Sequence, residues 1–201
     1  MPSPVVHIID DDKAMRDSLV FLLEASGLAA RTYESALSFL EQLDPTGSGV
    51  VVTDVRMPEI GGLELVRRLR ARDAAWPIIM ITGHGDVPLA VEAMKAGVVD
   101  FLEKPFDEES LLAAIRSALA DHAKLEADQA ERERVRLMLD GLSPREREVL
   151  DGVIAGKPNK TIAHELSISP RTVEVYRANV MSKTGARGLS ELMRMVLLAR
   201  T

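Results

Sequence analysis

Side chains that can bind a metal ion or a phosphate follow directly after four short, strand-like segments. They are Asp10 and Asp11 after Val5–Ile9, Asp54 after Val50–Thr53, Thr82 after Ile78–Ile81, and Lys104 after Asp100–Glu103. The carboxyl ends of parallel strands in an open α/β sheet meet at one crevice. We therefore expect these side chains to lie close together in the fold.

The expected chemistry is the phosphorylation of an aspartate. Asp10, Asp11 and Asp54 would form a cluster of carboxylates that repel one another unless a hard cation, Mg²⁺ or Mn²⁺, neutralises them. Asp54 is then the candidate nucleophile, while Lys104 offers a positive charge and Thr82 a hydroxyl donor to the phosphate oxygens. Each of these residues alone fits a turn, a helix cap or a surface contact, so only their joint spacing favours a site.

The elements that must position these residues alternate between strand and helix, which predicts a parallel sheet covered by helices on both faces. The expected strands are Val5–Ile9, Ala29–Tyr33, Val50–Thr53, Ile78–Ile81 and Asp100–Glu103. The expected helices are Lys13–Ser26, Ser35–Leu43, Gly62–Arg72, Val87–Ala96 and a fifth from about Glu108. Gly27 and Gly97 are expected to cap helix C-termini, and Asp107 to cap the N-terminus of the fifth helix.

The last third of the chain contains helical patterns only, at Pro144–Ala155, Asn159–Leu166, Pro170–Thr184 and Gly188–Leu198. Ser143 and Glu146 have the spacing of a capping box, with Pro144 at the first helical position. The second and third of these helices, joined by a tight turn, predict a helix-turn-helix whose second helix enters a DNA major groove. By periodicity alone, a generic helical hairpin fits equally well.

The domain boundaries follow from these patterns. We expect a first domain over residues 1–121, a linker over residues 122–140 and a second domain over residues 141–201. The segment Asp121–Asp140 is rich in Ala, Glu, Asp and Arg and has no Gly or Pro. It is either a solvated helix that continues the fifth helix or a flexible tether, and its apolar residues are too sparse for a sustained coiled-coil seam.

Composition limits the function classes. The chain has no cysteine, which excludes disulfides and thiolate metal sites and favours a cytoplasmic location. No apolar run approaches the length of a membrane span, so no membrane partner is expected. The net charge of −6 conceals an asymmetry. Residues 1–121 hold 11 Lys and Arg against 20 Asp and Glu, whereas residues 142–201 hold 10 against 6, so the second part can face a polyanion.

The acidic crevice resembles that of the receiver domains of two-component response regulators. The resemblance covers residues 4–121 and is carried by Ile8–Asp12, Thr53–Pro58, Ile81–Gly83 and Phe101–Phe106. It implies a flavodoxin-like, five-stranded parallel (βα)5 fold and the transfer of a phosphoryl group from a sensor histidine kinase to Asp54. It also implies metal ligation by Asp11, Asp54 and the backbone carbonyl of Arg56, with Asp10 assisting through water.

The same resemblance implies a conformational switch. Thr82 and Phe101 occupy the positions at which a hydroxyl moves toward the phosphoryl group and an aromatic ring turns inward, which alters the surface of the fourth helix and fifth strand. Dimerisation after phosphorylation is expected at that surface, with Val91, Lys95 and Val98 as contributors. Two DNA-binding modules can then engage two half-sites together.

The helical end resembles the LuxR-type DNA-binding domain, a four-helix helix-turn-helix unit, over residues 137–201. Leu142–Leu150, Gly156, Asn159–Ala163 and Ser169–Arg177 carry this resemblance, while Pro170–Met181, His84–Pro88 and Glu92–Gly97 are similar to regulators of the FixJ type. The expected phosphate contacts are Lys160, Thr161, Arg171, Thr172 and Lys183. The expected base contacts are Glu174, Val175, Arg177 and Ala178. Promoter DNA and RNA polymerase are the implied partners.

Two other functions are compatible with parts of this pattern. A Mg²⁺-dependent phosphatase-like enzyme would use Asp54 as its nucleophile, but it would need a second acid two residues later, where the chain has Arg56. A DNA-binding regulator that acts without phosphorylation would retain the crevice for structure alone. We expect a regulator and not an enzyme.

Overall fold

The computed structural model describes residues 4–43, 49–72, 76–83 and 87–200. The chain separates into two compact units, Met1–Lys124 and Leu125–Thr201, each of which is considered by itself. Of the predicted motif His84–Pro88, residues 84–86 lie outside the described part of the chain.

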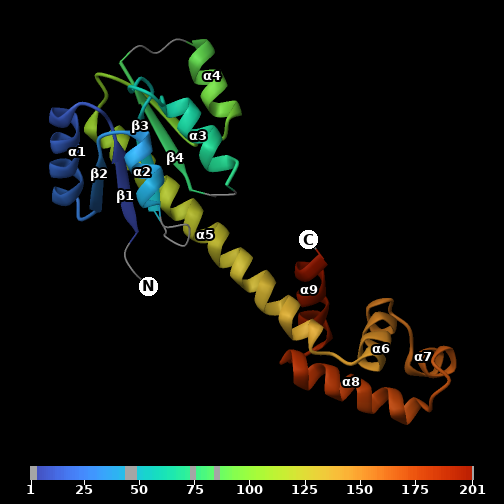
Figure 1. Ribbon diagram of the computed structural model, residues 1–201. Helices are drawn as coiled ribbons and strands as arrows, with labels where there is room; N and C mark the ends of the chain where they lie inside the picture. Colours follow the sequence, from blue (N-terminus) through green and yellow to red (C-terminus); the bar gives the residue numbers. More distant parts are fainter. Residues whose placement is uncertain (1–3, 44–48, 73–75, 84–86, 201) are drawn as a thin grey trace. The chain divides into compact units, whose positions relative to one another are not determined.

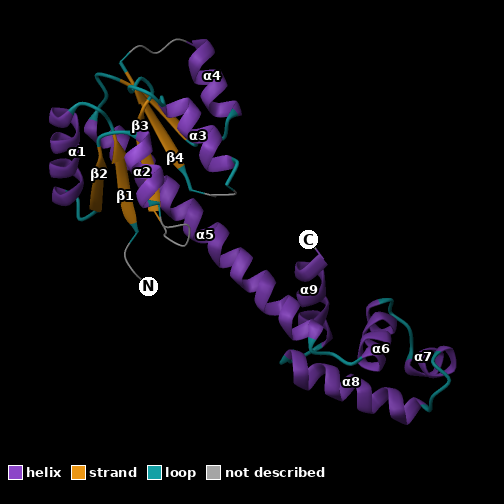
Figure 2. Ribbon diagram, viewed as in Figure 1, coloured by secondary structure: helices purple, strands orange, loops and turns teal. Residues whose placement is uncertain are grey.

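The first unit is built on a parallel sheet of five strands (Figures 1 and 2). The strands are β1 (Val5–Ile9), β2 (Ala29–Tyr33), β3 (Gly49–Asp54), β4 (Ile78–Thr82) and β5 (Asp100–Glu103), arranged in the order β2-β1-β3-β4-β5. Every neighbouring pair is parallel. The central strand β3 is buried along its whole length, which explains its uninterrupted apolar sequence. The predicted flavodoxin-like fold is confirmed.

Helices cover both faces of the sheet. They are α1 (Lys13–Ala25), α2 (Ala36–Gln42), α3 (Gly62–Arg70), α4 (Val87–Lys95) and the first part of α5 (Glu108–Asp140). One core cluster joins α2, α3 and α4 to the sheet, around Phe39, Leu65 and Leu69. A second cluster joins α1 and α5 to the opposite face, around Leu23, Leu111 and Ile115. Figure 1 shows α1 and α3 on opposite sides of the strands.

Local signals in the sequence set the ends of these elements. Gly27 and Gly97 adopt positive φ after α1 and α4, as expected of helix C-terminal glycines. The Asp107 carboxylate accepts the backbone N–H of Ser110 at 3.1 Å, as predicted for an N-cap. At their carboxyl ends, β3 and β4 each extend one residue beyond the predicted range, so Asp54 and Thr82 are the last residues of their strands. The crevice is therefore built on the sheet itself.

The segment Asp121–Asp140 is helical, because α5 runs from Glu108 to Asp140. Of the two predicted alternatives for this segment, a continued helix and a flexible tether, the helix is confirmed. Glu131 and Arg134 form an ion pair at 2.6 Å on its exposed side, in a stretch whose side chains are almost all exposed. Val135, however, is fully buried, so the last turns of α5 contribute to the core of the second unit.

In the described part of the second unit, the regular elements that follow α5 are helices joined by short turns. The helices are α6 (Pro144–Ile154), α7 (Asn159–Glu165), α8 (Pro170–Thr184) and α9 (Leu189–Arg200). One core cluster forms around Leu150, Val180 and Leu192 from α6, α8 and α9, and another around Val149, Ile162 and Val173 from α6, α7 and α8. The predicted capping box is present, since the side chain of Ser143 accepts the Glu146 N–H and Glu146 accepts the Ser143 N–H.

A buried histidine lies in the larger core cluster of the first unit. The ring of His7 on β1 lies 4.8 Å from that of Trp76 and 5.7 Å from that of Tyr33, measured between centroids. Its Nδ1 atom lies 3.0 Å from the Tyr33 hydroxyl. Burial, and to a smaller degree the charge of Arg31, lowers the pKa of His7 to about 4. His7 is therefore a buried packing residue of this cluster.

We predict that His7 makes the first unit sensitive to acid. A histidine whose folded pKa lies below its unfolded value of about 6.5 contributes stability above that pH, and this contribution falls as the pH drops from 6.5 toward 4. Between pH 7 and pH 5 the native chain should lose about 2 kcal/mol more than a His7→Asn variant. Urea unfolding followed by the fluorescence of Trp76, the single tryptophan, measures this difference. An identical pH dependence in both proteins would contradict the prediction.

Candidate functional site

The side chain of Lys104 lies between two carboxylates at the carboxyl end of the sheet. Its Nζ atom donates to Asp54 Oδ1 at 2.7 Å and to Asp10 Oδ2 at 3.1 Å. The carboxylates are buried, with side chains only 10 % and 5 % exposed, whereas the Lys104 side chain is 23 % exposed. Asp10, Asp54 and Lys104 are far apart in the sequence but meet in the fold, which confirms the predicted convergence of these three residues.

Sheet register explains why these two carboxylates meet. Ile9 of β1 pairs with Thr53 of β3, so the next residues along the chain, Asp10 and Asp54, reach the same edge. The second oxygen of each carboxylate is held by the backbone two residues later. Asp10 Oδ1 accepts the Asp12 N–H at 2.8 Å, and Asp54 Oδ2 accepts the Arg56 N–H at 2.6 Å. Both carboxylates are thereby fixed in orientation.

A glycine allows close packing beside Asp54. Gly62, the first residue of α3, abuts the backbone of Asp54 so closely that a Cβ atom would collide with the Asp54 carbonyl oxygen. A larger residue would have to push α3 away from the end of β3. The glycine thus lets the helix support the strand end that carries Asp54.

The charge of Lys104 is stabilised by its two partners. Burial alone would lower the pKa of Lys104, but the hydrogen bonds to Asp54 and Asp10, together with their charges, raise it above its ordinary value. Lys104 is therefore a permanent cation at physiological pH. Its charge compensates part of the repulsion between the two buried carboxylates.

The donor set at this edge fits a hard divalent cation only in part. Asp10 and Asp54 present carboxylate oxygens, which Mg²⁺ prefers. The side chain of Asp11 is exposed, and within the described ranges no group of three or more acidic, histidine or cysteine side chains is gathered closely enough to hold a metal ion. Arg56 donates its N–H to Asp54, and ligation of a metal by its backbone carbonyl stays a prediction.

The remaining residues of the predicted switch lie on β4 and β5. Thr82 is buried at the end of β4, and its carbonyl oxygen accepts the Lys104 N–H at 2.7 Å. Phe101 on β5 is half-buried and packs against the core cluster that contains α3 and α4. The backbone of Lys104 thus ties the end of β4 to the end of β5, directly beside the carboxylates.

Two residues near the crevice have roles that the sequence did not reveal. Arg16 of α1 donates from Nη1 to the Asp10 carbonyl oxygen at 2.6 Å, which ties the first helix to the strand end. Asp12, the third residue of the acidic triplet, caps α1 by accepting the N–H groups of Ala14 and Met15. The only signal for Arg16 was its position one turn into a helix that follows the acidic triplet.

The predicted dimerisation residues on and after α4 are not all available at the surface. Val91 is 47 % exposed and Lys95 is exposed. Val98 is only 3 % exposed and belongs to the core, so it does not offer its side chain to a partner. The choice of Val98 is therefore wrong as a direct contact. Its neighbour Val99 is 46 % exposed.

In the second unit, most of the predicted DNA contacts lie on exposed positions of α7 and α8. Lys160 and Thr161 are exposed in the first turn of α7. Among the predicted contacts over residues 170–178 of α8, Arg171, Glu174, Val175 and Ala178 are exposed. Their spacing of three, four and seven residues places these four on one face of the helix.

Three other predicted contacts are already engaged inside the unit. Arg177 donates from Nη1 to Asn159 Oδ1 at 2.7 Å, which turns its guanidinium toward the start of α7 and away from the expected base contact. The Thr172 hydroxyl lies 2.8 Å from that of Ser169, the residue that caps α8. Lys183 donates to Glu146 Oε2 at 2.7 Å. Spacing along a helix could not reveal these partners, because they come from turns and other helices.

The Glu146 carboxylate is a buried structural group. Lys183 and the Ser143 N–H donate to it and lower the pKa of Glu146 to about 2. The capping role expected from the sequence is confirmed, and only 3 % of the residue is exposed. Its ion pair joins the start of α6 to the end of α8.

Comparison with known proteins agrees with both halves of this description. Residues 6–116 match the response regulator receiver domain, and residues 140–196 match the bacterial regulatory proteins of the luxR family. The transcriptional regulatory protein FixJ of Azorhizobium caulinodans is 57 % identical over 194 residues, which are 96 % of this chain and 92 % of that protein. FixJ of Bradyrhizobium diazoefficiens is 51 % identical over 96 % of this chain and 95 % of its own length.

Solved structures lead to the same family. The response regulator StyR is 40 % identical, covers 97 % of this chain and 98 % of its own, and has a TM-score of 0.89. Full-length FixJ from B. japonicum is 50 % identical, covers 100 % of this chain and 98 % of its own, and has a TM-score of 0.62. The chain therefore belongs to the response regulators that join a receiver domain to a LuxR-type DNA-binding domain. Within that family it is of the FixJ type.

The function of such a regulator is phosphorylation-dependent control of transcription, with a sensor kinase and DNA as partners. No helix in the described part of the chain combines the length and the apolar character that a membrane span needs.

We predict that Lys104 stabilises the first unit through its two carboxylate partners. Lys104→Met leaves Asp10 and Asp54 charged and close together, which should lower the free energy of unfolding by about 2 kcal/mol at pH 7. Lys13→Met is the matched control, because Lys13 pairs with Asp17 on an exposed helix surface and should cost less than about 0.5 kcal/mol. Urea unfolding followed by Trp76 fluorescence compares the two variants. Equal losses in both would contradict the role assigned to Lys104.

Proposed function

We propose that Asp54 is the residue that receives the phosphoryl group. The observation that carries this proposal is the contact between the Asp54 carboxylate and Lys104 at the carboxyl end of the sheet. An oxygen of the carboxylate attacks the phosphorus of a phosphohistidine on the kinase. A P–O bond forms while the P–N bond breaks, and its electron pair returns to the imidazole.

The residues around Asp54 divide the task of stabilising the phosphoryl group. Lys104 is already within hydrogen-bond distance of the Asp54 carboxylate. Once Asp54 is phosphorylated, the Lys104 ammonium can donate a hydrogen bond to a phosphoryl oxygen. The Arg56 N–H fixes the other carboxylate oxygen. A Mg²⁺ or Mn²⁺ ion held by Asp10, Asp11, Asp54 and the Arg56 carbonyl would neutralise charge on the incoming phosphoryl group.

The Asp11 carboxylate must move toward the crevice to complete that metal site. Its side chain is exposed and borders the first turn of α1, so a change of rotamer is the simplest route. Asp10 and Asp54 each have one oxygen on Lys104. Both carboxylates would also be ligands for the cation, whose positive charge would add to that of the lysine.

Phosphorylation changes the α4–β5 surface through Thr82 and Phe101. If Lys104 moves with the phosphoryl group, the backbone bond from Lys104 to Thr82 transmits that movement to β4. The hydroxyl of Thr82 then donates to a phosphoryl oxygen, and the ring of Phe101 repacks toward the core. An exposed ion pair between Arg67 of α3 and Glu92 of α4, at 2.6 Å, connects α4 to its neighbouring helix. A movement of α4 would act on this pair.

The altered surface forms a homodimer in this proposal, with Val91 and Lys95 as contact residues. Val87, Val91 and Met94 give α4 an exposed apolar side, which suits a partner surface. Dimerisation brings two DNA-binding units to two half-sites and raises their effective concentration without a new base contact. RNA polymerase is the further partner that transcription control requires.

A phosphotransfer experiment tests the role of Asp54. Acetyl phosphate and magnesium should add one phosphoryl mass to the full chain, detected by intact mass spectrometry, and none to Asp54→Asn. The control is Asp17→Asn, which removes an exposed aspartate of α1 and should be modified like the native chain. Equal modification of Asp54→Asn would refute the proposal. Rapid catalytic release of phosphate, without accumulation of the adduct, would instead support the phosphatase-like enzyme.

The same samples test whether phosphorylation acts on DNA binding. The modified native chain should sediment as a dimer and bind promoter DNA more tightly, whereas Asp54→Asn should stay unchanged by the phosphodonor. Unchanged operator affinity of a fully phosphorylated chain would favour a regulator that binds DNA independently of phosphorylation.

We predict that Arg171 contacts a phosphate and that Val175 contacts a base. Arg171→Met should weaken binding to specific and unrelated DNA alike and reduce the slope of log affinity against log salt by about 1. Val175→Ala should leave that slope unchanged and reduce the preference for the operator. Arg194→Met is the control for loss of a positive charge, since Arg194 lies on α9. A salt slope unaltered by Arg171→Met would contradict its assignment.

A further inference from the structure

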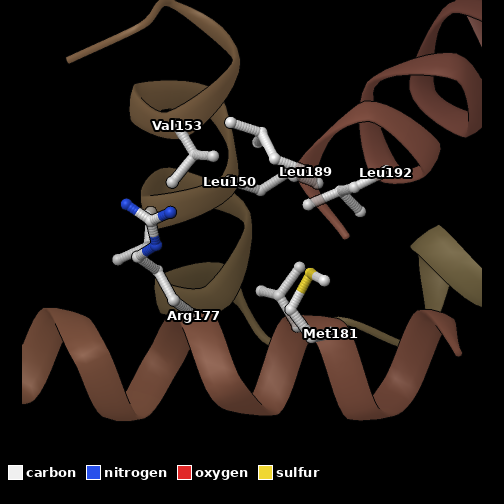
Figure 3. A pocket seen from close by; sticks show the side chains of 8 residues that line it. Leu150, Val153, Arg177, Met181, Leu189 and Leu192 are labelled. Carbon is white, nitrogen blue, oxygen red and sulfur yellow. The ribbon is translucent and has the colours of Figure 1, made fainter. Parts of the chain in front are cut away.

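The second unit contains a small apolar cavity between three helices. Its volume is about 100 Å³, and seven of its eight lining residues are apolar. Figure 3 shows Leu150 and Val153 of α6, Met181 of α8, and Leu189 and Leu192 of α9 arranged around this space. The receiver-like crevice takes no part in it, because all the lining residues belong to the second unit.

The eighth lining residue is a half-buried arginine. Arg177 extends from α8 beside Val153, as Figure 3 shows, and donates from Nη1 to the neutral amide oxygen of Asn159. Among the residues that the structure describes, no carboxylate forms an ion pair with Arg177. The guanidinium carries five N–H donors, of which this contact uses one. A positive charge without a counter-charge therefore borders an apolar space.

We infer that this cavity binds a small monocarboxylate with a short alkyl chain. The carboxylate would accept hydrogen bonds from Arg177, and the chain would fill the apolar space between α6, α8 and α9. An apolar cavity of about 150 Å³ can hold a benzene-sized ligand, so about 100 Å³ corresponds to a chain of about four carbons. Charge complementarity excludes an alkylammonium, and the lack of polar groups on the other walls disfavours a sugar or a nucleotide.

The site would act on the DNA-binding helix. Arg177 and Met181 lie on α8, the same helix that presents Arg171 and Val175, while Asn159 begins α7. A carboxylate bound by the other N–H donors of Arg177 would draw the guanidinium toward the cavity and strain its bond to the Asn159 amide. Its binding thus alters the contact between α7 and α8, and DNA affinity should respond in parallel. This consequence depends on the proposed DNA-binding role, whereas ligand binding does not.

The test uses the full chain labelled with ¹³C at its methionine methyl groups. Met181 lines the cavity, whereas Met15 and Met57 lie in the first unit and serve as internal references. Sodium butyrate should shift the Met181 signal in a saturable way, with sodium chloride as the control for ionic strength. Butyramide, which has the same shape without the charge, should bind at least about tenfold more weakly, and butylammonium should not bind.

Two variants locate the site. Arg177→Met should abolish the preference for butyrate over butyramide, whereas Arg194→Met, which removes an exposed arginine of α9, should keep it. Leu189→Trp, a change at a residue that is 45 % exposed, should block the cavity to both ligands without burying a new polar group. Because Leu189 is exposed, this variant remains informative if Arg177→Met does not fold.

Three results would overturn the inference. They are the absence of a saturable Met181 shift with butyrate, an equal response to butyrate and sodium chloride, and an unchanged butyrate preference in folded Arg177→Met. The last result, or no binding at all, would leave Arg177 as a structural tie between α8 and α7. Butyrate binding without any change in DNA affinity would retain the site and remove its link to the DNA-binding helix.

Discussion

The first unit depends on one shared cation. Two buried carboxylates on adjacent strands would repel each other strongly, and the Lys104 ammonium is the group that holds them together. The same lysine is bound through its backbone to Thr82, at the end of β4. Side-chain electrostatics and sheet hydrogen bonding therefore meet in one residue. A charge added at Asp54 cannot leave Lys104 unaffected, and through it the ends of β4 and β5.

Several contacts hold the ends of β1 and β3 in place beside these charged groups. The strand ends are fixed by backbone N–H groups on both carboxylates, by Arg16 on the Asp10 carbonyl, and by the close approach of Gly62 to Asp54. Rigid support on the β1 and β3 side leaves movement to the other side, where α4 has few buried side chains. A signal that begins as local electrostatics can thus be expressed at a surface.

In the second unit, buried or half-buried polar side chains join one helix to another. Its short helices rely on contacts between elements distant in sequence, and the Glu146–Lys183 pair joins the beginning of α6 to the end of α8. Because Glu146 also belongs to the capping box, one carboxylate starts a helix and fixes its neighbour. The Arg177–Asn159 bond plays the same part between α8 and α7. Arg177 and Lys183 are thus paired with other residues of the unit, whereas Lys160 and Arg171 lie on exposed positions of α7 and α8.

The amino-acid sequence by itself determined the parallel fold, the helix caps and the convergence of Asp10, Asp54 and Lys104. These follow from local periodicity, from glycine and serine chemistry, and from the rule that parallel strands end at one edge. Only the tertiary structure decided that Val98 is buried, that Arg177 bonds to Asn159, and that Lys183 pairs with Glu146. The physical reason is that a helical or extended pattern assigns a residue to a face. What covers that face depends on segments far away in the chain.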